Sequence, residues 1–300
     1  MQKKLTGLGP ALVTPFLEDG TIDFQGLERL LHFLGPHVDY FVVLGTTGEV
    51  STLNAEERQM IFDFVADNNP WKHPLVMGVG GINTAEVVAQ LQHFNLEKAD
   101  AVLSVCPYYV KPTQQGLLQH FSTVADASPK PVILYNVPAR TASNLAAETT
   151  LELAWHPNII GIKEASGNLD QILKIAAGKP KEFLLISGDD LLAPALMAMG
   201  AVGVISVIAN AFPEAYSKVV HQAALGHFKA SRENLFALLN INELLYTEGN
   251  PAGVKAALEI LHICKTFTRL PLAPASPTLM LAMEEAMSKL PVEYVMHEGI

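Results

Sequence analysis

Short apolar runs alternate with longer amphipathic stretches over the first two thirds of the chain. Eight runs rich in β-branched and aromatic residues predict strands, at residues 9–16, 40–44, 75–79, 101–106, 132–136, 159–163, 183–187 and 204–208. Between them, apolar residues recur at three- and four-residue steps, which is typical of amphipathic helices, for example at 26–34, 56–67, 84–94 and 115–125. This alternation predicts a parallel βα architecture.

Two helix starts carry a capping signal. Asn54 is followed three residues later by Glu57, and Asn83 is followed at the same spacing by Glu86. In this pattern the side chains of the cap residue and of the third helical residue each bond to the other's backbone N–H. We therefore expect reciprocal capping at both positions.

The apolar strands favour a closed barrel over an open sheet. They are apolar almost without interruption, as in parallel strands that are covered on both faces. The alternative is an open, doubly wound sheet, which usually has a Gly-x-Gly-x-x-Gly turn after its first strand; here Thr14-Pro15-Phe16 stands there. We expect an α/β fold, a TIM (β/α)8 barrel over residues 1–225.

From about Pro213 onward the pattern contains no further strand. Helical segments are expected at 214–225, 230–246 and 253–261, and a proline-rich stretch at 270–277 precedes one more helix through Met287. The first of these helices would complete the barrel. The remainder, residues 226–300, predicts a C-terminal helical extension packed on the barrel, with a role that the pattern does not reveal.

Composition fits one folded, acidic protein. Of the 300 residues, 49% are hydrophobic and 17% charged, which supplies a core and argues against disorder. The 20 basic and 30 acidic residues give a net charge of −10, with no basic cluster, so we expect no nucleic-acid partner. An anionic small substrate is still compatible, because it responds to local charge.

Cysteine use and hydropathy suggest a cytoplasmic location. Cys106 and Cys264 show neither metal-ligand spacing nor a disulfide framework, so we expect buried thiols in a reducing compartment. Residues 1–7 carry charge but lead into no apolar segment of the secretory type. No run of about 18 apolar residues is present to span a membrane.

One lysine is out of place in this pattern. Lys163 ends the apolar run 159–163, where an ammonium group is rarely tolerated. A lysine taken out of water loses its proton more readily, and a neutral amine attacks ketones. The alternative is a strand-end lysine that pairs with a carboxylate or reaches water. This segment alone leaves both interpretations open.

Other reactive side chains follow the strands at the same face, because the carboxyl ends of barrel strands lie together. Residues 45–49 (Gly-Thr-Thr-Gly-Glu) bring backbone and hydroxyl groups close enough to hold a carboxylate, or form an ordinary tight turn. Tyr135 offers a phenol for proton transfer beside Lys163, or an aromatic cover for the barrel mouth. Arg140 is a carboxylate clamp or a solvated loop residue.

Taken together, these positions favour catalysis. They predict an imine between Lys163 and a keto acid whose carboxylate is held by Thr46 and Thr47. The cationic imine acidifies the adjacent carbon, and the resulting enamine attacks an aldehyde. The histidines are scattered, so neither a metal nor a cofactor is expected.

Three segments, 45–49, 135–141 and 161–167, resemble the 4-hydroxy-tetrahydrodipicolinate (dihydrodipicolinate) synthase family of pyruvate-dependent lyases. Segments 187–190, 203–206 and 248–251 extend the resemblance over nearly the whole chain. The resemblance implies condensation of pyruvate with aspartate 4-semialdehyde in diaminopimelate and lysine biosynthesis. It also implies a homotetramer built as a dimer of dimers.

Residue roles follow from the resemblance. Lys163 forms the Schiff base, Tyr135 transfers protons, and Thr46 completes a relay with Tyr109, the latter reaching in from a neighbouring subunit. The substrate-binding residues are expected to be Thr47, the backbone of Ile205, Arg140 for the carboxylate of the aldehyde, and Gly188.

The chain departs from the family where many members bind inhibitory lysine. Val50, Ala55, Arg58 and Ile82 stand at those places, although Glu86 and Tyr108 are retained. Val50 and Ile82 offer no side-chain hydrogen bonds to an amino acid. We therefore expect weak or absent feedback inhibition.

Two other functions remain compatible with a single sequence. A sister aldolase that cleaves a sugar acid or a hydroxy-oxoglutarate would use the same imine. A non-catalytic barrel is less compatible, because it has no need for Lys163, Tyr135, Thr46, Thr47 and Tyr109 together.

Overall fold

The structure, a computed structural model, describes residues 5–294. The predictions that concern residues 1–4, and the last six residues of the expected extension, lie outside the described residues.

Eight parallel strands form one sheet in the order β1-β8-β7-β6-β5-β4-β3-β2. The strands are β1 (Gly7–Pro10), β2 (Phe41–Val43), β3 (Leu75–Gly78), β4 (Ala101–Val105), β5 (Val132–Asn136), β6 (Ile159–Glu164), β7 (Leu184–Ser187) and β8 (Gly203–Ser206). A parallel bridge between Ala11 and Val42 joins the chain just after β1 to β2. This bridge closes the sheet, so the predicted barrel is confirmed and the open sheet is excluded.

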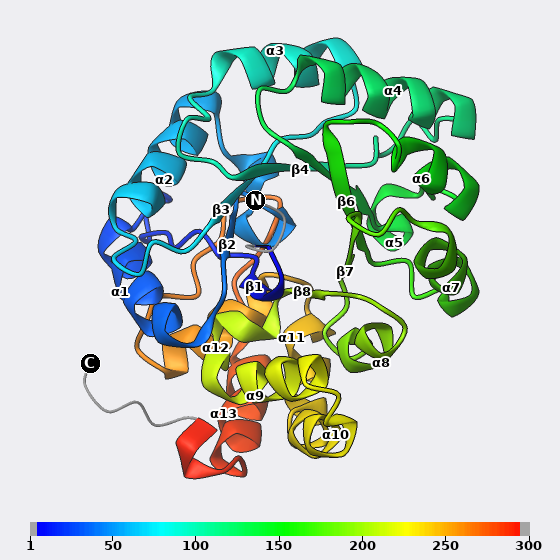
Figure 1. Cartoon of the computed structure of the whole chain (residues 1–300). Coiled ribbons are helices and arrows are strands. Elements are labelled where there is room, and N and C mark those ends of the chain that lie inside the picture. The colour runs from blue at the N-terminus through cyan, green and yellow to red at the C-terminus, as the bar shows by residue number, and fades with distance from the viewer. Residues whose placement is uncertain (1–4, 295–300) are drawn as a thin grey trace.

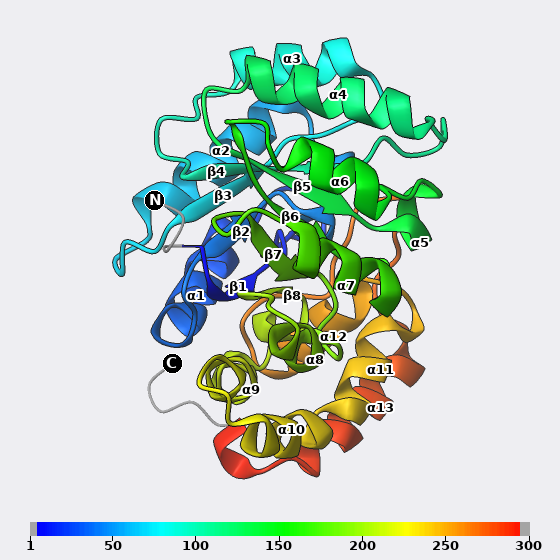
Figure 2. The ribbon, with the colours of Figure 1, turned by 45° about the vertical axis from the view of Figure 1, so that its right-hand side comes forward.

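Helices surround the barrel, and the last five pack together on one side of it. They are α1 (Phe24–Leu34), α2 (Ala55–Asp67), α3 (Thr84–His93), α4 (Gln114–Ala127), α5 (Pro138–Thr141), α6 (Ala147–Leu153), α7 (Leu169–Gly178), α8 (Ala193–Ala198), α9 (Pro213–Ala224), α10 (Phe228–Ala237), α11 (Leu239–Thr247), α12 (Ala252–Ile260) and α13 (Pro277–Ser288). In Figures 1 and 2, α9 to α13 lie together on the side of β1 and β8. Within residues 5–294, no helix is both long and apolar enough to cross a bilayer.

Two expected strands are shorter in the structure. The run 9–16 gives β1 only to Pro10, and the run 204–208 gives β8 only to Ser206. Beyond β8, the Asp190 carboxylate accepts the backbone N–H groups of Val207 and Ile208, both at 3.0 Å, which turns the chain out of the ladder. Val207 and Ile208 are buried although they are not paired in the sheet. The apolar run in the sequence is therefore longer than the strand.

The helices differ from the prediction in two respects: one predicted helix is divided, and three short helices were not predicted. The predicted helix 230–246 is two helices, α10 and α11, which meet at Leu238. The break is consistent with packing, because it lets Leu238, Ile241 and Leu245 all become buried. Short helices α5, α6 and α8 were not predicted; each is too short to show a clear apolar period.

The capping predictions have different outcomes. At Asn54 the reciprocal box is present: the Glu57 N–H donates to Asn54 Oδ1 at 2.8 Å and the Asn54 N–H donates to Glu57 Oε2 at 3.0 Å. At Asn83 the reciprocal box is wrong. Its Oδ1 accepts from Ala85, and the Glu86 carboxylate bonds to the Asn83 side-chain amide instead of its backbone.

The barrel interior is filled by side chains. Residues from alternating strand positions pack there, including Tyr40, Val76, Ile133 and Ile186. Gly9 is required for this packing, because a Cβ at that position would lie 2.2 Å from the Tyr40 ring. The barrel interior is therefore a packed core.

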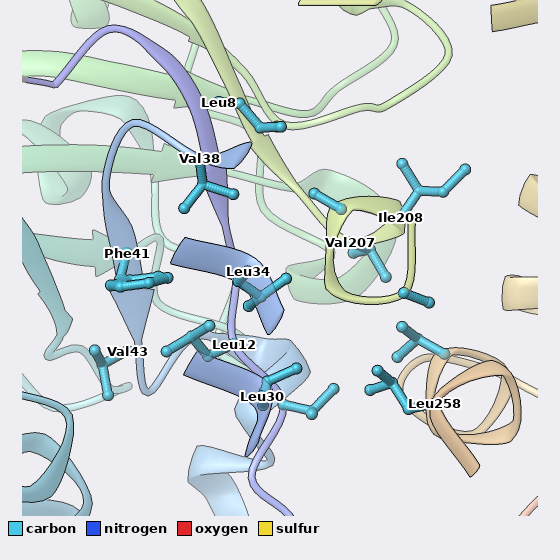
Figure 3. Close-up of a cluster of buried hydrophobic side chains, with 14 of the residues drawn as sticks. Leu8, Leu12, Leu30, Leu34, Val38, Phe41, Val43, Val207, Ile208 and Leu258 are labelled. Carbon is cyan, nitrogen blue, oxygen red and sulfur yellow. The ribbon is translucent and has the colours of Figure 1, made fainter. Parts of the chain in front are cut away.

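A larger apolar cluster lies between the strands and the outer helices. Figure 3 shows Leu30 and Leu34 of α1 against Phe41 of β2. On the other side lie Leu258 of α12 and Ile208, which follows β8. The extension therefore shares one core with the barrel. A division of the chain at residue 225 stays a prediction.

Both cysteines are free and buried, as predicted. Burial raises the pKa of the Cys264 thiol to about 12, so this thiol stays protonated and unreactive at neutral pH.

One buried histidine makes stability depend on pH. His120 of α4 is 5% exposed, its Nδ1 lies 2.9 Å from Thr84 Oγ1, and burial lowers its pKa to about 4. Because the folded chain resists protonation, stability present above the ordinary pKa of about 6.5 is lost as pH falls towards 4. We expect the free energy of unfolding to fall by roughly 2 kcal/mol more in wild type than in His120→Gln between pH 7 and 4.5.

Urea unfolding of the two proteins at several pH values measures this difference. His93→Gln, which changes an exposed histidine of α3, serves as the control and is expected to keep the wild-type slope. Equal pH slopes for wild type and His120→Gln would contradict the prediction.

Candidate active site

Strand register brings the two main candidates together. Tyr135 of β5 and Lys163 of β6 are direct partners in the ladder, and both lie near the carboxyl ends of their strands. Lys163 is 6% exposed, and its Nζ lies 4.3 Å from the centroid of the Tyr135 ring. The expected neighbourhood of amine and phenol is thus present.

The next residue of β6 fixes the strand end. Because side chains alternate, Glu164 points to the opposite face from Lys163 and is fully buried. Its carboxylate accepts from the Ser166 N–H at 2.7 Å, from Asn136 Nδ2 at 3.1 Å and from Gln171 Nε2 at 3.2 Å. These bonds satisfy the buried charge and hold the lysine's backbone in place.

Gly188, directly after β7, leaves room for the lysine. A Cβ at this position would lie 3.0 Å from Lys163 Cε and 2.7 Å from the Cβ of Ala165. Any larger residue would therefore push the lysine side chain out of its present path.

The threonine turn, which we define as residues 45–49, follows β2. Thr47 is buried, and its Oγ1 accepts a hydrogen bond from Asn250 Nδ2 at 2.9 Å. Since this oxygen already accepts, the hydroxyl proton of Thr47 is free to be donated to a carboxylate. Glu49 ends the turn in the left-handed region, with φ of 55°.

A cavity of about 300 Å³ joins these groups. Its lining residues are Thr46, Thr47, Tyr135, Val137, Arg140, Lys163, Ala165, Gly188, Asp189, Asp190, Leu191, Val207, Asn242, Tyr246 and Asn250. Six of the eight predicted site residues are therefore brought to one cavity. One of them, Arg140, carries a guanidinium suited to an anionic substrate.

Several lining residues escaped the sequence analysis. Asn242 and Tyr246 lie on α11, which was expected to be the end of one long helix and carried no chemical signal. Asn250 belongs to the segment 248–251, whose resemblance to the family could have marked it. The extension therefore supplies one wall of the site.

Three buried oxygens at this cavity lack a hydrogen-bond partner within the described residues. They are Oδ1 of Asp190, of Asn242 and of Asn250. Burial raises the pKa of Asp190, although bonds from backbone N–H groups oppose the shift. Unpaired buried acceptors are costly, so this wall of the cavity carries unsatisfied polar groups.

A second cavity of about 320 Å³ adjoins the first and shares Thr46, Tyr135, Val137 and Arg140 with it. Its further lining includes Val50, Arg58 and Tyr108.

Two predicted residues do not line either cavity. Ile205 is buried in the barrel interior, where it pairs with Gly9. Tyr109 is 85% exposed, has φ of 70°, and donates its backbone N–H to the Thr141 carbonyl. The structure thus places its side chain outside the cavity of its own chain.

Within residues 5–294, no group of three or more His, Cys, Asp or Glu side chains is arranged to hold a metal ion. The expectation that neither metal nor cofactor is needed stays a prediction.

Comparison with known proteins agrees with this geometry. The model of the Dihydrodipicolinate synthetase family matches residues 4–290. The chain belongs to this family. The 4-hydroxy-tetrahydrodipicolinate synthase of Cytophaga hutchinsonii is 44% identical over 97% of this chain and 98% of its own. The resemblance of the sequence to this family is thereby confirmed.

Solved structures of the family share the fold. The dihydrodipicolinate synthase of Aquifex aeolicus superposes with a TM-score of 0.92 at 36% identity, covering 98% of this chain and all of its own. A variant described as the first monomeric dihydrodipicolinate synthase has a TM-score of 0.92 at 33% identity, covering 96% and 97%. Like its relatives, the chain is a lyase.

The Gly188 contact gives a direct test. Its backbone is not in the left-handed region, so alanine is accommodated by the backbone and only its Cβ is obstructed. We expect Gly188→Ala to fold but to lower kcat of the family's synthase reaction by about 100-fold, because the amine is displaced. Gly116→Ala, where the added Cβ meets nothing within 3.4 Å, is the matched control. Unchanged kcat in Gly188→Ala would contradict the positional role of this glycine.

Proposed function

We infer that the chain condenses pyruvate with aspartate 4-semialdehyde to 4-hydroxy-tetrahydrodipicolinate, in diaminopimelate and lysine biosynthesis. Family membership over residues 4–290 supports this reaction. The observation that carries it is the buried amine of Lys163, 4.3 Å from the Tyr135 ring and facing one cavity with the threonine turn.

The first step forms the imine. The neutral amine of Lys163 attacks the ketone carbon of pyruvate, and the carbinolamine loses water to give a cationic imine. Tyr135 supplies and removes the protons, with Thr46 as the next member of the relay. The Thr47 hydroxyl, whose oxygen accepts from Asn250, donates to the pyruvate carboxylate, and the backbone of Ile205 contributes to the same binding.

The second step forms the carbon–carbon bond. Loss of a methyl proton converts the imine to an enamine, which attacks the aldehyde carbon of the second substrate. The substrate amine then displaces Lys163 and closes the ring. No cofactor takes part, because the cationic imine is itself the electron sink.

Arg140 and the opposite wall suit the second substrate. Arg140 lies at the exposed edge of the cavity, where a guanidinium can hold a carboxylate with two bonds. Asp190, Asn242 and Asn250 line the opposite wall, and carboxylate and amide oxygens suit an ammonium group. Aspartate 4-semialdehyde carries both groups, which supports it over the alternative substrates of sister aldolases.

We also propose a homo-oligomer, a tetramer built from dimers. Tyr109 is 85% exposed and lies outside its own cavity, which fits a tyrosine that enters the relay of a neighbouring subunit. A cytoplasmic location is proposed on the grounds of two free, buried thiols and the biosynthetic reaction. We propose no nucleic-acid or membrane partner.

The role of Arg140 predicts a specific kinetic defect. In Arg140→Ala we expect KM for aspartate 4-semialdehyde to rise by about 30- to 100-fold, since the carboxylate loses its partner, with a smaller change for pyruvate. Steady-state turnover with both substrates varied measures this difference. Arg232→Ala, at an exposed position of α10, is the control.

Two results would overturn the proposed reaction. One is cleavage of a sugar acid or hydroxy-oxoglutarate by a wild-type enzyme that gives no product from aspartate 4-semialdehyde. The other is the absence of product from pyruvate and aspartate 4-semialdehyde in wild type. Equal KM values for the aldehyde in Arg140→Ala and wild type would instead contradict the carboxylate-binding role of Arg140.

Feedback by lysine is expected to be weak or absent. Val50 lines the second cavity, and Ile82 is 42% exposed. Both side chains are hydrocarbon, so neither can form a hydrogen bond to an amino acid. Turnover measured at increasing lysine concentration should stay near its starting rate. Strong inhibition at low lysine concentration would show that other groups provide the binding.

A further inference from the structure

We propose that Lys255 and Arg269 of the C-terminal extension are positioning residues that hold the threonine turn in the shape that binds pyruvate. This inference rests on the proposed function, in which Thr47 binds the pyruvate carboxylate. It also assigns the extension a role that the sequence pattern did not reveal.

An ion pair ties the turn to the extension. Lys255 Nζ of α12 lies 2.5 Å from Glu49 Oε1, and both side chains are fully buried. The same ammonium donates to the Phe267 carbonyl at 2.7 Å and lies 4.5 Å from the centre of the Phe16 ring. The carboxylate at the end of the threonine turn is thus held at a fixed distance from α12.

Arg269 extends this network to the surface. Its backbone N–H donates to Glu49 Oε2 at 3.1 Å. Its guanidinium pairs with both oxygens of Glu57, at 2.8 and 2.6 Å, and donates to the Thr52 carbonyl at 3.1 Å. Both carboxylate oxygens of Glu49 are therefore bound, each by a group from the extension.

The remaining edge of the turn is bound as well. Thr14 Oγ1 donates to the Gly48 carbonyl at 2.7 Å, and Asn250 Nδ2 donates to Thr47 Oγ1. Glu49 itself has φ of 55°, a conformation that a residue with a side chain keeps only when its surroundings determine it. Glu49 lies two residues after Thr47, so a shift of its backbone moves the substrate-binding hydroxyl.

Physical reasoning favours positioning over stability as the purpose of the pair. A buried ion pair costs desolvation, and well-packed apolar residues of similar volume often give equal or greater stability. What a bidentate, two-partner arrangement adds is a defined direction and distance for the carboxylate. In this chain the fixed direction of the Glu49 carboxylate holds the threonine turn beside the cavity that Lys163 lines.

The test compares two variants of the same helix. Lys255→Met removes the ammonium and keeps an unbranched side chain that is one heavy atom shorter, and Leu258→Ala removes an apolar side chain from the shared core. The second change lowers stability because it leaves a cavity in the core, but it removes none of the hydrogen bonds to the threonine turn. Calorimetric titration with pyruvate alone then reports binding, and thermal unfolding reports stability.

We expect the pyruvate dissociation constant to rise by about tenfold or more in Lys255→Met and to stay at the wild-type value in Leu258→Ala. Equal dissociation constants in Lys255→Met and wild type, or equal rises in both variants, would overturn the inference. Failure of the wild type to bind pyruvate would instead overturn the proposed function.

A second variant covers the case in which Lys255→Met does not fold. Arg269→Gln acts at the outer end of the network, where the side chain is 20% exposed, and should weaken pyruvate binding by about two- to threefold. Lys229→Gln, at an exposed position of α10, is its control. Unchanged pyruvate binding in Arg269→Gln would then exclude a positioning role for the Arg269 guanidinium.

Discussion

The site depends on the pairing of β5 with β6. Because Tyr135 and Lys163 are partners in one parallel ladder, phenol and amine become neighbours as soon as the strands pair. Alternation along β6 then sends Glu164 to the other face, where Asn136 and Gln171 satisfy its carboxylate. The same hydrogen bonds that make a buried carboxylate tolerable also fix the backbone that carries Lys163. The closeness of phenol and amine is thus a consequence of strand register.

The opposite side of the cavity is built by residues far away in the chain. The threonine turn follows β2, yet its hydroxyl is fixed by Asn250 and its end by Lys255, more than 200 positions later. The extension also contributes Asn242 and Tyr246 to the wall. Barrel and extension share one apolar core, so the two halves of the site are held to each other by packing as well as by hydrogen bonds. The C-terminal helices are therefore part of the candidate active site.

Much of this arrangement could be predicted from the sequence, for physical reasons. Uninterrupted apolar strands predicted a barrel. Lys163, Tyr135 and Thr47 lie at or after the carboxyl ends of strands, so they were expected at one face, and they line one cavity. The sequence did not predict that Asn242 lines the cavity, because α11 begins after a break at Leu238 that is consistent with packing and has no local signal in the sequence. The Glu49–Lys255 pair was equally invisible, because a pairing across such a distance in the chain leaves no local signal. Local periodicity predicts elements; it does not predict which distant polar groups meet.

The central claim is that Lys163 is the nucleophile. Mass spectrometry of wild type and Lys163→Ala, after incubation with pyruvate and reduction by borohydride, tests it most directly. A pyruvyl adduct that peptide mapping assigns to Lys163, absent in the alanine variant, is the predicted result. No adduct in wild type, or an adduct on another lysine, would show that Lys163 is a structural residue at the end of its strand.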